Sequence, residues 1–133
     1  MSAKYYIYLE TKLNVIDISN LLETVDLGWN TLPRLHANQI AKTCPHFSMS
    51  ILQPSESLAE SLGNTYQIKT PSLSCSFNYR GYSEYAHQAI LPIVRVLVFL
   101  LKELDGDVAF LFEDTSFTYL VRRNGKTLLT TGH

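Results

Sequence analysis

The chain has few of the residues that define several common protein classes. Among its 133 residues are two cysteines, six glycines and five prolines, too few for a disulfide scaffold, a collagen-like repeat or a low-complexity chain. Its charge is nearly balanced, with eleven Lys and Arg against twelve Asp and Glu. Nothing in the overall charge favours a nucleic acid or an acidic membrane surface, so we expect no nucleic-acid partner.

The chain also lacks a long hydrophobic run. Its most apolar stretch, residues 89–101, contains Pro92 and Arg95 and is shorter than the ~20 residues that a bilayer-spanning helix needs. Residues 1–10 contain no apolar segment of signal-peptide length. We therefore expect a cytoplasmic protein with no membrane contact, in which Cys44 and Cys75 remain thiols.

The residues that are present indicate one folded domain over residues 1–133. The composition is 46% hydrophobic and 17% charged, which suits a chain that buries most of its apolar surface. Tyr5, Ile7 and Leu9 alternate with Tyr6, Tyr8 and Glu10, which is the period-two pattern of a strand. Alternating or continuously apolar runs predict strands at residues 4–11, 47–52, 65–70, 73–79, 108–112, 117–123 and 126–131.

Two main helices are predicted. The first spans residues 15–25, with Asn14 as its N-cap, Asp17 completing a capping box and Gly28 as its end. The second runs from Ser83 to about residue 104 and is apolar on nearly all sides, so it is expected to lie against a sheet and to be covered elsewhere too. Pro92 predicts a kink or a restart in it. Residues 54–63 are read as a short polar helix or loop, and residues 29–43 as a loop.

This order of elements predicts an α+β fold. We expect an antiparallel sheet of about five to seven strands, with the two main helices packed on one face. Asn124-Gly125 between two apolar runs is a strong hairpin signal. The last three strands should therefore form a C-terminal three-strand meander.

The sequence offers little support for catalysis. Cys44 and His46 are two residues apart, which on an extended segment separates their side chains by about 6–7 Å, too far for a direct thiolate–imidazolium pair. A turn could close that gap, but no carboxylate lies beside them to orient the imidazole. His36 with Cys44 and His46 matches no zinc-site spacing. We expect no catalytic residue, no cofactor and no metal, and therefore a protein that is not an enzyme.

The charge pattern points instead to binding. Five acidic residues and no basic one lie between positions 103 and 114, at the two ends of a predicted strand. Carboxylates can enter a basic cleft of a partner and speed association, although acids are also common in turns. The predicted partner-binding residues are Asp105, Asp107, Glu113 and Asp114, with Trp29 as an apolar anchor. Arg122, Arg123 and Lys126 are read as a basic hairpin tip that protects an edge strand.

Residues 75–130 resemble a known family. They combine a strand with a polar turn, a long apolar helix, a Gly106-Asp107 turn with an apolar strand, and an Arg-rich strand with a glycine turn. This layout resembles the C-terminal half of small bacterial immunity proteins from the swarming-inhibition toxin exchange systems of myxobacteria. The opening strand from Tyr5 and the helix after it are also similar in layout. The resemblance implies a noncatalytic cytoplasmic protein that binds and blocks one cognate toxin domain.

Two other functions remain open at this point. One is an adaptor or chaperone for a secreted effector, which would bind a broader set of clients. The other is a small thiol or histidine enzyme that uses Cys44 and His46. The oligomeric state is left open.

Overall fold

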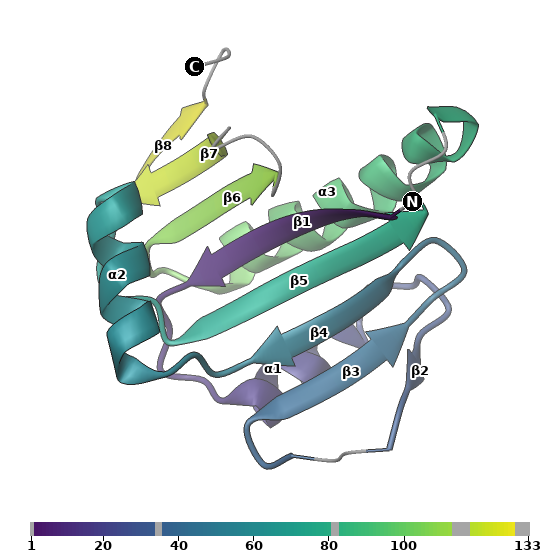
Figure 1. Cartoon of the computed structure of the whole chain (residues 1–133), viewed down its shortest axis with the longest axis horizontal. Helices are drawn as coiled ribbons and strands as arrows, with labels where there is room; N and C mark the ends of the chain where they lie inside the picture. The colour runs from purple at the N-terminus through teal and green to yellow at the C-terminus, as the bar shows by residue number, and fades with distance from the viewer. Residues whose placement is uncertain (1, 34–35, 81–82, 113–117, 130–133) are drawn as a thin grey trace.

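The computed structural model of the chain describes residues 2–33, 36–80, 83–112 and 118–129. Within these residues one antiparallel sheet has eight strands in the order β2-β3-β4-β5-β1-β6-β7-β8, accompanied by three helices (Figure 1). The strands are β1 (Ser2–Leu9), β2 (Asn30–Thr31), β3 (Gln39–Thr43), β4 (Ser48–Leu52), β5 (Leu73–Arg80), β6 (Val108–Phe112), β7 (Thr118–Arg123) and β8 (Lys126–Leu129). The helices are α1 (Val15–Leu22), α2 (Glu56–Tyr66) and α3 (Ser83–Glu103).

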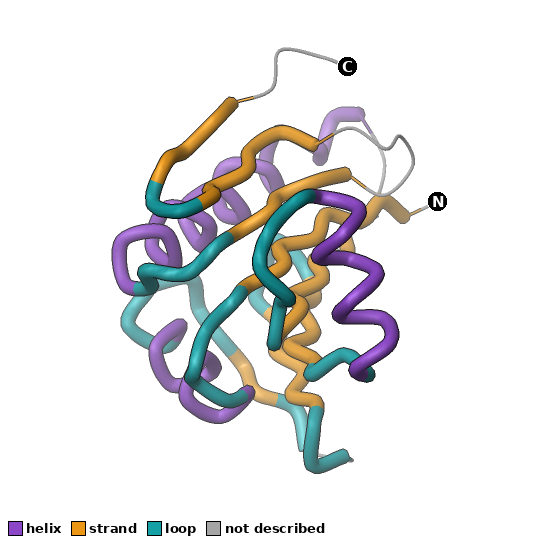
Figure 2. Tube along the Cα trace, turned by 90° about the vertical axis from the view of Figure 1, so that its left-hand side faces the viewer, coloured by secondary structure: helices purple, strands orange, loops and turns teal. Residues whose placement is uncertain are grey.

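The helices lie on opposite faces of the sheet. Figure 2 shows α1 and α3 on one side of the strands and α2 on the other. The α1 and α3 side holds the main core, in which Ile7 and Leu9 of β1 pack with Ile18 of α1 and Leu100 of α3. A smaller cluster of Ile68, Ala109, Leu111 and Val121, with three tyrosines around it, lies on the α2 side.

The predicted fold class is confirmed, because the structure is an α+β arrangement with a single antiparallel sheet. The strand count was too low, since the predicted loop at 29–43 contains β2 and β3. In β3 the residues that point inward are Ile40 and Lys42. A lysine at a core position breaks the alternation of apolar residues by which a strand is recognised.

The strand predicted at residues 65–70 is wrong. Residues 65 and 66 end α2, and Gln67 follows in the left-handed conformation with φ of 55°. Tyr66 and Ile68 both contact the outer face of the sheet, from the helix end and the turn after it. Tyr66 and Ile68 are two residues apart, which is the spacing of residues on one face of a strand. Here, however, Tyr66 belongs to the end of a helix and Ile68 to the turn after it.

Helix α1 begins as predicted and ends earlier. Asn14 accepts a hydrogen bond from the backbone N–H of Asp17, and the Asp17 carboxylate accepts one from the N–H of Asn14, which completes the capping box. The helix ends at Leu22, not at Gly28. From there to Val25 each backbone N–H bonds to the carbonyl three residues before it, so the chain continues in tighter turns.

The C-terminal half follows the prediction closely. Helix α3 runs through Pro92 as one helix, so it does not restart there. Strands β6, β7 and β8 form the predicted meander, and both Asn124 and Gly125 have positive φ, at 52° and 81°, as a tight hairpin turn requires. In the described part of the chain, no helix combines the length and apolar character that spanning a membrane would require.

Candidate functional site

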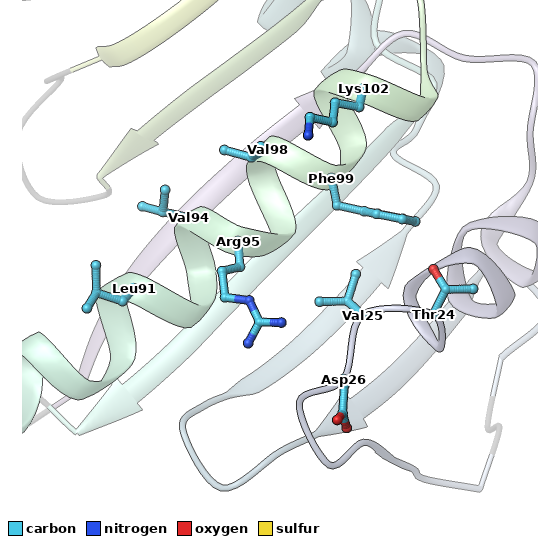
Figure 3. Close-up of a pocket in the computed structure, with 9 residues that line it drawn as sticks. All are labelled: Thr24, Val25, Asp26, Leu91, Val94, Arg95, Val98, Phe99 and Lys102. Carbon is cyan, nitrogen blue, oxygen red and sulfur yellow. The ribbon is translucent and has the colours of Figure 1, made fainter.

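An open groove of about 750 Å³ lies between the outward side of α3 and the turn that follows α1 (Figure 3). One wall is α3 and the other is the segment from Thr24 to Asp26. The opposite side of α3 faces the core, where residues such as Val96 and Leu100 are fully buried. The groove is lined by Thr24, Val25, Asp26, Leu91, Val94, Arg95, Val98, Phe99 and Lys102.

The α3 wall combines exposed apolar side chains with two cations. Leu91 is 68% exposed and Val98 is 43% exposed. Arg95 and Lys102 are also exposed, and neither forms an ion pair with another described residue. The sequence indicated that this helix must be covered on both sides, but within the described residues its outward side is open. The groove can therefore accept an apolar ligand surface that carries negative charge.

A buried lysine supports the other wall. Lys42 on β3 has no exposed surface, and its ammonium group donates hydrogen bonds to Ser19 Oγ at 3.1 Å, to Thr31 Oγ1 at 2.9 Å and to the Glu23 carboxylate. All three of its N–H donors can thus be satisfied, which a buried cation needs. Because Glu23 directly precedes Thr24, this ion pair ties the end of α1 to β3.

Trp29 adds a second support to the same wall. Its indole N–H donates to the carbonyl of Val25 at 2.9 Å, and its ring contacts Phe47 edge-on. The Lys42 ammonium lies 5.5 Å from the centre of the Trp29 ring, within range of a cation–π interaction. Trp29 was predicted to be an apolar anchor for a partner. In the structure it is half-buried and holds Val25 in place beside the groove.

We expect the Glu23→Gln variant to lose a pH-dependent part of its stability. The hydrogen bond from Lys42 lowers the pKa of the Glu23 carboxyl below its ordinary value of 4.5. A carboxyl with a lowered pKa in the folded state stabilises the fold above its unfolded-state pKa, and this stabilisation disappears as the pH falls through the lowered pKa. Because Glu23 is half exposed, the variant should be less stable at pH 7 by only about 1 kcal/mol.

Urea unfolding of both proteins between pH 7 and strongly acidic pH measures this difference. The difference should shrink at acidic pH, where Glu23 is protonated. In a Lys42→Met background the same Glu23→Gln change should lack the pH dependence, since its cause has been removed. A difference that stays constant down to acidic pH would show that the ion pair does not contribute.

The structure separates the predicted acidic residues. Asp105 is exposed in the turn after α3. Asp107 is only 5% exposed, and its two carboxylate oxygens accept hydrogen bonds from the backbone N–H groups of Lys69 at 2.9 Å and Asn124 at 3.0 Å. A partner cannot reach the Asp107 carboxylate without breaking these bonds, so its role is internal. Glu113 and Asp114 lie outside the described residues.

The cysteines and histidines show no assembled catalytic centre in the described part of the chain. Cys44 is half-buried, His46 is exposed, and the Cys44 backbone N–H bonds to the carbonyl of Phe47 in a tight turn. Burial raises the pKa of the Cys75 thiol to about 12, which keeps it protonated and unreactive at neutral pH. No group of three potential metal ligands occurs among the described residues.

Sequence reasoning missed the residues that line the groove. The signal was present in the helix from Ser83: Leu91 and Val98 are seven residues apart, and so are Arg95 and Lys102. This spacing puts each pair on one side of a helix. The other wall had no such signal, because only the folded chain brings residues 24–26 beside α3.

No known protein family, curated protein or solved structure matches this chain. The structural class of the protein is therefore assigned from its own fold and groove. The protein belongs to the α+β class, with an antiparallel sheet and an apolar, basic groove on its helical side.

Proposed function

We propose that this chain is an immunity protein, which binds a cognate bacterial toxin domain in the cytoplasm and blocks the active site or substrate path of that domain. The observation that carries the proposal is the groove beside α3. Its side chains Leu91 and Val98 expose apolar surface next to Arg95 and Lys102, two exposed cations that form no ion pair with another described residue. An apolar strip bordered by charge is typical of a surface that another protein covers.

The similarity in layout between residues 75–130 and small bacterial immunity proteins supports the same function. The resembling segment includes α3 and the meander that follows it, and so it includes the α3 wall of the groove. A standard protein interface buries about 1,600 Å² in total and involves about 20–30 residues of each partner, more than the nine residues that line the groove. We expect the contact to extend past the end of α3 to the exposed Asp105.

Co-expression with a toxin domain encoded by the adjacent open reading frame tests the proposal. The chain should form a stable complex with that domain, visible by size-exclusion chromatography, and should protect the cells that produce it. A complex in which the toxin stays active, together with binding of unrelated effectors, would indicate an adaptor or chaperone. Absence of both complex and protection would contradict the proposal.

The Cys44→Ala and His46→Ala variants should protect cells as well as the unchanged protein does. An inhibitor that acts by covering its target needs no nucleophile, and neither residue lines the groove. Cell survival and toxin affinity should be measured together for each variant. Loss of protection by a variant that remains folded and still binds the toxin would favour a thiol or histidine enzyme.

A further inference from the structure

The outward side of α3 has a seven-residue repeat. Its apolar residues have the spacing of the a and d positions, which form the core of a coiled coil. Its two cations occupy the e position, directly after d. The apolar positions are Leu91, Val94, Val98 and Leu101, and the adjacent cations are Arg95 and Lys102. Val94 and Leu101 are half-buried, and Leu101 also packs against the core. We call these six residues the α3 seam. Five of them line the groove.

We propose that the α3 seam binds an amphipathic helix of the toxin domain, whose apolar side packs along α3 and whose carboxylates face Arg95 and Lys102. This inference rests on the proposed function and adds the chemistry of the partner. Val25 and Phe99 border the seam toward the end of α1, where Figure 3 shows the Phe99 ring reaching toward Val25. The bound helix would contact this second wall as well as α3.

The spacing of the cations favours a helix as the bound element. Seven residues of α3 advance by about 10.5 Å, so Arg95 and Lys102 begin about that far apart along the axis. A partner helix matches this distance with two carboxylates that are also seven residues apart. A strand covers about 10 Å in three residues, but residues three apart point to opposite faces of a strand.

The charges also favour a different protein over a second copy of this chain. Packing α3 antiparallel against another α3 would bring the cations of the two seams together, and in either orientation no seam position offers them a carboxylate. Among the described residues, Asp26 is the one acidic residue that lines the groove. Its carboxylate points away from α3 in Figure 3. An acidic partner helix supplies the charge that the seam lacks.

The first test reverses the charge of the seam. The Arg95→Glu/Lys102→Glu variant should bind the toxin domain at least about tenfold more weakly, with slower association and a flatter dependence on salt. The matched control is Lys12→Glu/Lys126→Glu, which changes net charge equally at two exposed positions outside the groove. The affinity of the control variant for the toxin domain should stay within about twofold of that of the unchanged protein. Circular dichroism should show both variants folded.

The second test uses synthetic helical peptides of about three heptads, with leucine at the core positions and either glutamate or lysine beside them. The unchanged protein should prefer the glutamate peptide, and the Arg95→Glu/Lys102→Glu variant should prefer the lysine peptide. Equal binding of both peptides, or a dimer of this chain formed through α3, would overturn the docking of an acidic partner helix on the seam.

The two proposals fail in different ways. A toxin complex that the charge reversal leaves unchanged would overturn docking at the seam and keep the immunity function. Charge-selective peptide binding without any toxin complex would support the seam chemistry and contradict the immunity function.

Discussion

Alanine at position 106 is expected to destabilise the fold by about 3 kcal/mol or more, because the backbone of Glu10 leaves no room for a side chain there. A Cβ atom on Gly106 would lie 1.8 Å from the carbonyl oxygen of Glu10. The two segments cannot simply separate. The Glu10 N–H bonds to the Asp107 carbonyl, and the Asp107 N–H bonds to the Glu10 carboxylate.

Gly125→Ala is the matched control for this prediction. Gly125 has φ of 81°, but a Cβ atom there would meet nothing within 4 Å. This substitution therefore costs only the backbone strain of a left-handed residue, about 1–2 kcal/mol. Urea unfolding should give the two free energies of unfolding. Equal losses would mean that the close approach to Glu10 is relieved by a small shift.

Replacing Arg122 by leucine is expected to cost about 3–5 kcal/mol, because buried carbonyl groups would lose a charged donor. Arg122 is 8% exposed. Its guanidinium donates to the carbonyls of Leu101 at 2.6 Å, Leu104 at 2.5 Å and Gly106 at 2.8 Å. These carbonyls lie at and just beyond the C-terminal end of α3, where a cation also interacts favourably with the helix dipole.

The adjacent arginine provides the comparison. Arg123 donates in the same way to the carbonyls of Tyr66 and Gln67 at the end of α2, but it is more exposed. Arg123→Leu should therefore cost only about 1 kcal/mol, since water can replace the lost donor. The stability loss of Arg122→Lys should lie between those of Arg122→Leu and Arg123→Leu, because lysine keeps the charge and loses the forked geometry of the guanidinium group. Similar losses for Arg122→Leu and Arg123→Leu would contradict the role of burial.

These contacts change the interpretation of the hairpin tip. The sequence suggested that Arg122, Arg123 and Lys126 protect the edge of the sheet by their charge. In the structure Arg122 and Arg123 bind the ends of α3 and α2, and Lys126 is exposed on the edge strand β8. The sequence carried no signal for this role, because only the folded chain shows that these two arginines of β7 lie beside the ends of α3 and α2.

The elements that sequence reasoning placed correctly depend on short-range interactions. The capping box of Asn14 and Asp17 joins residues three apart, and the turn at Asn124-Gly125 needs only two residues that tolerate positive φ. The apolar pattern of α3 and β6 likewise predicts five core residues, which are Leu97, Leu100, Leu101, Phe110 and Phe112. Leu97, Leu100 and Phe110 are buried, whereas Leu101 and Phe112 are partly buried and pack against the core.

By itself the sequence determined the α+β class, the C-terminal meander and the two main helices, because their signals come from residues close together in the chain. Tertiary structure alone decided the pairing of Lys42 with Glu23, the burial of Asp107 and the approach of residues 24–26 to α3. Each of these joins residues 17 or more positions apart. A charged residue looks the same in a sequence whether it is solvated or bonded to distant groups, and only the packed chain shows which applies.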